Sequence, residues 1–158
     1  MDWIDGEIEG CTLTPLHTYK DDRGWLGEFF RKDELPAPLF PAMGYLSLTH
    51  SGVTRGPHEH VHQTDLFLFF SGRFRLFLWD HRSGSPTRGR RWVIEVGEAA
   101  PMRVIIPPGV VHAYRNEGET DALVINCPNQ LYAGEGKKEA VDEIRHEDLA
   151  NSPFNMDL

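Results

Sequence analysis

The chain has 158 residues, of which 40% are hydrophobic and 25% are charged, and its formal net charge at pH 7 is -8. This length suits a single domain, residues 1–158, with a substantial core. The negative charge opposes nucleic-acid binding, which needs a basic surface, and no apolar run approaches the roughly 20 residues of a membrane span. No signal-peptide pattern is visible, and Cys11 and Cys127 cannot form a disulfide framework. We therefore expect a cytoplasmic protein without nucleic-acid or membrane partners.

Short segments rich in Val, Ile, Phe, Leu and Tyr recur along the chain, separated by Gly- and Pro-containing turn signals. In chain order they are WLGEFFR, YLSLTH, DLFLFF, FRLFLWD, RWVIEV, MRVII, VHAYR and ALVINC. Short strands at such regular spacing predict an all-β sandwich or barrel.

The segments DLFLFF and FRLFLWD flank a turn at residues 71–73, which predicts a hairpin with Gly72 at positive φ. The second segment alternates, with one face made of Phe74, Leu76 and Leu78 and the other of Arg75, Phe77 and Trp79. The second face is too apolar for a free surface. We expect another sheet or another subunit to cover it.

One segment near the C-terminus, GKKEAVDEIRHEDLA, has a helical pattern. Its apolar residues form a thin stripe, and no Pro or Gly interrupts it after Gly136. We expect a short C-terminal helix that docks on the barrel.

The stretch GVTRGPHEHVHQTDLFLFFSG places His58, His60 and His62 on alternate residues and Asp65 soon after. In a strand, the three histidines would point to the same side. A later segment, PPGVVHAYRN, adds His112. The pattern fits either a metal site or one catalytic base with neighbouring histidines.

These two segments resemble the paired motifs of the cupin superfamily, G-x5-HxH-x4-E-x6-G and PxGxxHxxxN, with Asp65 at the usual Glu. The resemblance implies a double-stranded β-helix, a jelly-roll barrel. In many cupins this motif holds a metal. The ligands here would be His58, His60, Asp65 and His112, a set that suits a divalent transition metal.

Further segments resemble a narrower cupin family, the dTDP-4-dehydrorhamnose 3,5-epimerases. YKDDRGWLGEFF is similar to F-x-D-x-RG-x-F-x-E-x-F, GVTRGPH to GVLRGLH, LWDHRSGSPTRGRRW to DLRxGSPTxGxW, and IIPPGVVHAY to IPxGxAHGF. The segment IRHEDL stands at the family's W-D-D-P. The likeness runs from about Tyr19 to Asp148, while RGPHEH is closer to the RGxHAH of related 3,4-ketoisomerases.

The epimerase resemblance implies three catalytic roles. His58 would be the general base that removes a proton next to a ketone, and Asp148 would orient it. A tyrosine would act as the acid from the opposite face, and Tyr132 is the candidate. His112 is expected in the same site.

The resemblance also implies how the substrate, a nucleotide-linked sugar, is held. Arg23 and Arg55 would bind the diphosphate through bidentate hydrogen bonds. Glu28 lies in the element that reaches a neighbouring subunit. We expect a homodimer in which an N-terminal edge strand meets the partner.

The sequence departs from the family at the residue that should stabilise the enolate. The family uses a lysine in a KLV segment, where this chain has Asp65, and Met43 and Tyr45 replace two amide contacts. A metal could polarise the ketone instead. Alternatively, a protonated His60 or His62 beside Asp65 could donate to the carbonyl oxygen.

Three functions follow. The first is an epimerase or ketoisomerase acting on a nucleotide-linked 4-keto-6-deoxy sugar, with His60 assisting His58 and no cofactor. The second is a metal-dependent cupin, either a dioxygenase or an isomerase. The third is a sugar-binding cupin without catalytic activity.

Overall fold

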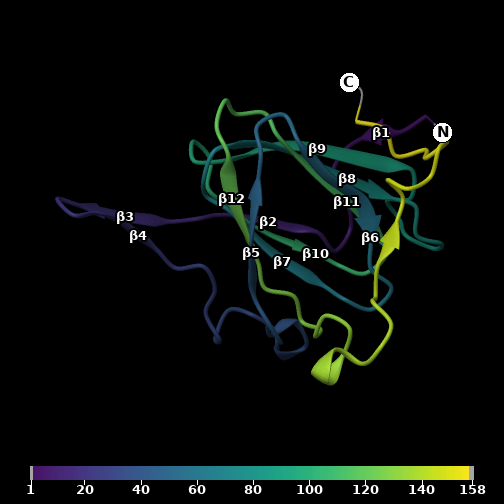
Figure 1. Ribbon diagram of the computed structural model, residues 1–158, viewed down its shortest axis with the longest axis horizontal. Coiled ribbons are helices and arrows are strands. Elements are labelled where there is room, and N and C mark those ends of the chain that lie inside the picture. Colours follow the sequence, from purple (N-terminus) through teal and green to yellow (C-terminus); the bar gives the residue numbers. More distant parts are fainter. Residues whose placement is uncertain (1, 157–158) are drawn as a thin grey trace.

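A computed structural model describes residues 2–156, and its regular structure consists almost entirely of strands (Figure 1). One sheet has the strand order β1 (Ile4–Asp5), β9 (Arg90–Gly97), β8 (Arg73–Asp80), β11 (Val110–Asn116), β6 (Thr54–Glu59) and β13 (Ile144–Arg145). The second has the order β2 (Thr12–Pro15), β10 (Met102–Ile106), β7 (Asp65–Phe69), β12 (Ala122–Asn126) and β5 (Tyr45–Thr49). The all-β, cupin-type jelly-roll prediction is confirmed.

The main core lies between the two sheets. Phe74 and Leu76 of β8 face Phe69 of β7 and Val104 of β10, and each of these side chains is fully buried. Because successive side chains alternate across a strand, β8 gives every second residue to this core.

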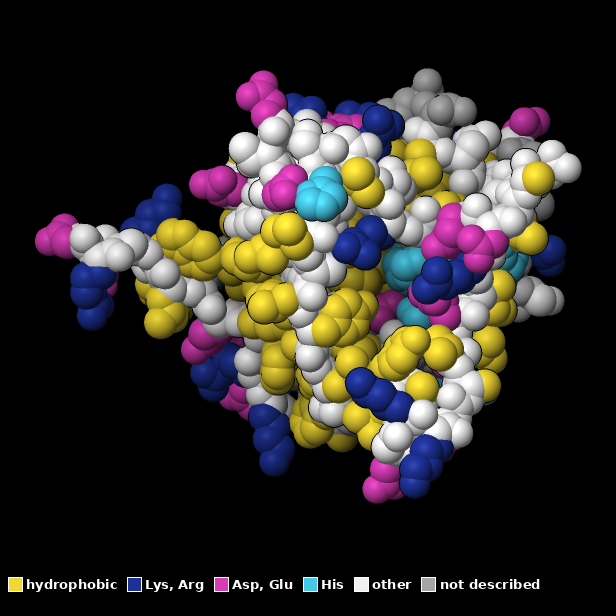
Figure 2. All heavy atoms as spheres, in the orientation of Figure 1, with side chains coloured by type: hydrophobic (Ala, Val, Ile, Leu, Met, Phe, Trp, Pro, Cys, Tyr) yellow, Lys and Arg dark blue, Asp and Glu magenta, His cyan; other side chains and the backbone are white. Residues whose placement is uncertain are grey.

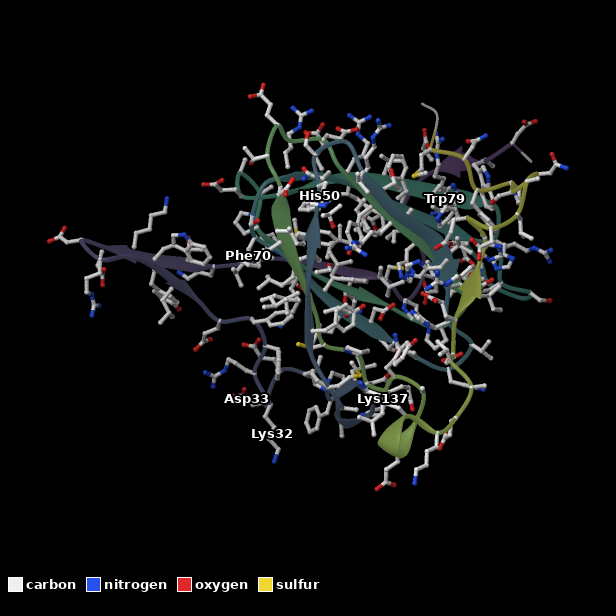
Figure 3. All side chains as sticks on the ribbon, viewed as in Figure 1. Lys32, Asp33, His50, Phe70, Trp79 and Lys137 are labelled. Carbon is white, nitrogen blue, oxygen red and sulfur yellow. The ribbon has the colours of Figure 1, made fainter. Side chains whose placement is uncertain are left out.

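The other face of β8 is covered by the ends of the chain itself. Phe77 and Trp79 are buried against Phe154, with Trp3 packed beside them, and Trp79 lies next to these terminal segments in Figure 3. The expectation that another sheet or subunit covers this face is therefore wrong.

The turn between β7 and β8 does not form a hairpin, because the two strands belong to different sheets. It carries the chain across the barrel instead. Gly72 has φ of 60°, as expected, and a Cβ there would lie 2.4 Å from the Cβ of Ala122. Glycine is therefore required both by the backbone conformation and by the close approach of β12.

The prediction of a C-terminal helix is also wrong. The segment contains a 3-10 turn (Glu135–Lys137) and the short strand β13; the other 3-10 turn, Ala37–Leu39, precedes β5. β13 pairs with the edge of β6. These long-range contacts outweigh a weak local helical preference.

A two-stranded hairpin, β3 (Thr18–Asp21) and β4 (Gly24–Gly27), projects from the body (Figure 1). Tyr19, Trp25 and Leu26 on it are at least half exposed. Figure 2 shows a further hydrophobic area over β5 and β12, where Leu46 and Leu48 are exposed. Among the described residues, no helix has the length and apolar character needed to cross a membrane.

Candidate active site

Three histidines meet inside one end of the barrel. His58 lies on β6, His60 directly follows that strand, and His112 lies opposite His58 on β11. The ring centroids of His58 and His112 are 4.5 Å apart, and each histidine has a ring nitrogen within 4.8 Å of those of the others. Histidine side chains are visible in a hollow beside β13 (Figure 2). His62, by contrast, is exposed.

Asp65, the first residue of β7, holds this cluster together from the opposite sheet. Its side chain is 1% exposed, and its Oδ1 accepts hydrogen bonds from Gln63 Nε2 and Asn126 Nδ2, both at 2.8 Å. Its Oδ2 lies 3.3 Å from Nε2 of His60 and 3.3 Å from Nε2 of His112. A buried carboxylate needs such partners; here Oδ1 has two hydrogen bonds, and Oδ2 meets the two imidazoles at ion-pair distance.

The histidines differ in charge although they lie side by side. Burial disfavours the charged form of His60, but the interaction with Asp65 outweighs this and raises its pKa to about 9. Burial lowers the pKa of His112 to about 3, and burial also lowers the pKa of His58, against the attraction of Glu143. At pH 7 the site therefore combines a neutral His58 with a protonated His60.

Two carboxylates that act on His58 come from Glu143 and Glu147, on either side of β13. Oε1 of Glu147 lies 4.0 Å from Nδ1 of His58, and Glu143 accepts a 2.7 Å hydrogen bond from Arg145 Nε. Asp148, to which the resemblance assigns the orienting role, is exposed. Glu147 has a carboxylate oxygen 4.0 Å from the His58 ring, while Glu143 exerts the larger attraction on the charged form of His58.

Sequence reasoning also missed the residue that fixes His60. Nδ1 of His60 donates to the backbone oxygen of Asp142. The Asp142 carboxylate in turn accepts backbone N–H groups of Val61, His62 and Gln63 at 2.8 to 2.9 Å. Asp142 lies about 80 residues away in a segment expected to be helical, so no local pattern could have indicated it.

The sequence indicated Tyr45 only as a replacement for an amide contact and not as a part of the Asp65 network. Its hydroxyl accepts a 2.9 Å hydrogen bond from Asn126, the same amide that binds Asp65. Its ring is partly exposed, but burial of the hydroxyl raises its pKa to about 12. Tyr45 is thus a protonated hydroxyl at the edge of the site.

Arg55, expected to bind the diphosphate, and Tyr132, the expected acid, make their contacts elsewhere. Arg55 donates to Thr49 Oγ1 at 3.0 Å and to the Leu48 oxygen at 2.8 Å. Tyr132 is 57% exposed in the loop that follows β12. The side chains of these two residues are not brought to His58.

Arg23 and Glu28 lie on the projecting hairpin and directly after it (Figure 1). Arg23 is highly exposed and pairs with Asp21 at 2.5 Å, while Glu28 pairs with Arg31 at 3.4 Å. Within one chain, neither residue reaches the histidine cluster.

The same histidines could also hold a metal ion. His58, His60 and His112 converge, and Asp65 adds an oxygen. Within residues 2–156, Asp65 Oδ2 and His112 Nε2 are both buried without a hydrogen-bond partner. Three imidazoles and a carboxylate suit a divalent transition metal, so the residues present fit such an ion.

Comparison with known proteins places the chain in a family. The sequence profile of the dTDP-4-dehydrorhamnose 3,5-epimerases matches residues 5–150. The chain belongs to this family. The epimerase resemblance, drawn from the RG and GSPT segments, is thereby confirmed.

Individual proteins also match this chain over most of its length. The spore coat polysaccharide biosynthesis protein SpsL of Bacillus subtilis is 37% identical over 79% of this chain and 82% of its own. The probable low-salt glycan biosynthesis epimerase Agl13 of Haloferax volcanii is 34% identical over 79% and 81%. A dTDP sugar isomerase structure from Desulfovibrio desulfuricans superposes with a TM-score of 0.78 at 26% identity, over 94% of this chain and 91% of the other.

Proposed function

We propose that the protein is an isomerase that removes and returns a proton next to the ketone of a nucleotide-linked 4-keto-6-deoxy sugar. The observation that carries this proposal is the pairing of His58 beside Glu147 with His60 beside Asp65 at one end of the barrel. Membership of the epimerase family supports the same substrate class.

His58 is the base in this proposal. Its Nδ1 faces Glu147, which leaves the other ring nitrogen to take the proton from the carbon next to the ketone. The distance of 4.0 Å is longer than a hydrogen bond, and such contacts often shorten when substrate binds. Glu147 orients the ring and stabilises the imidazolium that forms.

His60 takes the place of the missing lysine. As the proton leaves carbon, its electron pair forms a carbon–carbon double bond and the ketone oxygen becomes an enolate oxygen. A protonated His60 stabilises that charge as a neighbouring cation, because its Nδ1–H donates to the Asp142 oxygen and its Nε2 faces Asp65. A tyrosine then returns a proton to the same carbon from the opposite face; Tyr132 is the family's candidate, and the hydroxyl of Tyr45 is nearer to the Asp65 network.

The diphosphate is bound by Arg55 and, in a homodimer, by Arg23 of the partner chain. The exposed apolar hairpin and the open edge of β5 support such a dimer, because both would be buried by a second copy. The prediction of a cytoplasmic location is unchanged.

The test is deuterium exchange in D2O with dTDP-4-keto-6-deoxyglucose, followed by NMR. Exchange at C3 and C5 supports a 3,5-epimerase, and exchange at C3 alone supports a 3-epimerase or 3,4-ketoisomerase. His58→Asn should abolish exchange without unfolding the protein. Binding without exchange in the wild type would mean that the protein is a sugar-binding cupin and not an enzyme.

A metal-dependent cupin is the second candidate, supported by the unpartnered buried atoms of Asp65 and His112. A metal bound by His58, His60, Asp65 and His112 would act as a Lewis acid on the ketone. His58 would then be a ligand and unavailable as the base. Elemental analysis of protein purified without added metal separates the two candidates, because stoichiometric iron, nickel, manganese or zinc bound at this site would exclude His58 as the base.

A further inference from the structure

A second cluster of titratable side chains lies on the face of β6 opposite to His58. Its centre is Glu59, which is 6% exposed. Oε1 of Glu59 accepts a 2.8 Å hydrogen bond from Nε2 of His146, and both carboxylate oxygens lie 3.0 Å from Nε2 of His81. Since His58 and Glu59 are neighbours in a strand, the cluster and the candidate active site occupy opposite faces of the same short segment.

The backbone of β13 connects the two faces. Ile144 pairs with Glu59 and Arg145 with His58, and the N–H groups of His146 and Glu147 both donate to the oxygen of Pro57, at 2.9 and 3.0 Å. His146 points to Glu59 on the outer face, and Glu147 points to His58 on the inner face. The residue that faces the base is therefore next in sequence to the residue held by Glu59.

An apolar cover shields part of the cluster from water, while the side chain of His81 stays 37% exposed. The ring of Phe154, 5% exposed, lies 4.6 Å from that of His146 and 5.3 Å from that of His81, measured between centroids. Trp79 closes the other side of Phe154, at 5.8 Å. Hydrogen bonds to a carboxylate are stronger in such a setting than in water.

One of the two histidines departs from the pattern that this chain resembles. DHR stands here at the DLR of DLRxGSPTxGxW, so His81 takes the place of the leucine. His81 and His146 are far apart in sequence but bind the same carboxylate. Read singly in the sequence, each histidine carried no signal.

We propose that Glu59, His81 and His146 are positioning residues that fix β13 on β6 and so hold Glu147 at His58. The catalytic part of this inference rests on the proposed function. A loose β13 would let Glu147 move away from an imidazole that it already meets only at 4.0 Å. Misplacement of a group by about 1 Å can cost on the order of 100-fold in rate.

The first test replaces His146 by Phe, which keeps an aromatic ring beside Phe154 and removes the donor to Glu59. We expect kcat to fall on the order of 10-fold with KM unchanged, because Glu147 orients the base and does not bind the sugar. His146→Gln, which retains a side-chain N–H donor, should recover part of the rate. His50→Phe is the matched control, since His50 pairs with Asp121 at the end of β5, away from β13 (Figure 3). A loss confined to KM would overturn the proposal.

A double-mutant cycle shows whether His146 acts through Glu147. In a Glu147→Gln background, His146→Phe should lower kcat by less than about 2-fold, because the residue that it positions is already disabled. A full additional 10-fold loss would overturn the proposal. A bound divalent metal ion would also overturn the proposal if the His81→Leu variant no longer bound it and the His60→Gln variant still did. The cluster of Glu59, His81 and His146 would then be a metal site.

Failure of the proposed function can be told apart from failure of this inference. If the wild type exchanges no deuterium into any nucleotide-linked 4-keto sugar, the proposed function fails. Amide hydrogen exchange of the protein then still tests whether β13 is held on β6. His146→Phe should then expose the amides of His146 and Glu147, which His50→Phe should leave protected. Equal protection in both variants would overturn the positioning role.

Discussion

Replacing Asp65 by Asn tests the charge arrangement of the site most directly. Asp65 is fully buried, and its carboxylate keeps the pKa of His60 at about 9 instead of 6.5. That difference corresponds to about 3 kcal/mol of interaction. The pKa of Asp65 itself, about 2 instead of 3.8 despite its burial, corresponds to about 2 kcal/mol. Both values describe largely the same interaction, so we expect Asp65→Asn to lower the free energy of unfolding by about 2 to 3 kcal/mol at pH 7.

The variant should also discharge His60. Without the carboxylate, burial lowers the pKa of this imidazole against the hydrogen bond to the Asp142 oxygen and the attraction of Glu143, and the pKa should fall below about 7. The enolate would lose its neighbouring cation, and loss of one such electrostatic stabiliser typically lowers kcat on the order of 100-fold. Urea unfolding gives the stability, NMR titration of the histidines gives the pKa, and deuterium exchange gives the rate.

The pH dependence of stability has a defined sign. The depressed pKa of Asp65 stabilises the fold above about 3.8, and this contribution is lost as the pH falls toward about 2. The raised pKa of His60 stabilises the fold below 6.5, and this contribution is lost as the pH rises through about 9. The difference in stability between wild type and Asp65→Asn should therefore be largest between about pH 4 and 6.5.

Asp121→Asn is the matched control, because Asp121 pairs with His50 at 2.8 Å on the exposed surface. It should leave stability and rate near the wild-type values. If Asp65→Asn keeps the pKa of His60 above 7, or unfolds at the same urea concentration as Asp121→Asn, the charge assignment is wrong.

Three further predictions concern the same site. A plot of kcat/KM against pH should be bell-shaped. It should rise below pH 6.5 as His58 loses its proton and fall near pH 9 as His60 loses its proton. A profile that is flat from pH 6 to 10 would contradict these roles. Glu147→Gln should lower kcat on the order of 10-fold and Asp148→Asn less than 2-fold, and the reverse order would restore the family's assignment. Trp25→Asp should convert the expected dimer to monomer by analytical ultracentrifugation and weaken substrate binding, whereas a wild type that sediments as a monomer would remove the role of Arg23.

Features with a local signature could be predicted from the sequence. The alternation in β8 placed Phe74 and Leu76 in the core, and the HxH spacing brought His58 and His60 to one site with His112. The first prediction needs only the two-residue period of a strand; the same period also put His62 beside the other two histidines, and that part is wrong, because the strand ends at Glu59 and His62 is exposed. The barrel then follows from the number of such strands and from the family motifs.

Features that depend on distant contacts could not be predicted. The turn at Gly72 has the same local signature whether the next strand joins the same sheet or the other one. The C-terminal segment is held on β6 by Asp142, His146 and pairing with Glu59, none of which its own pattern contains. In a two-residue strand such as β13, a shift of one position also decides which carboxylate faces inward.

The exchange of the family lysine for Asp65 need not remove the positive charge from the site. A buried carboxylate at this position attracts a proton onto its neighbour, and His60 becomes the cation that the lysine would have been. The charge then belongs to a group with a pKa of about 9, held by Asp142 on one nitrogen and by Asp65 near the other. A lysine would keep its charge without such support, so the proposed chemistry depends on Asp65 within the motif and on the backbone oxygen of Asp142 far outside it.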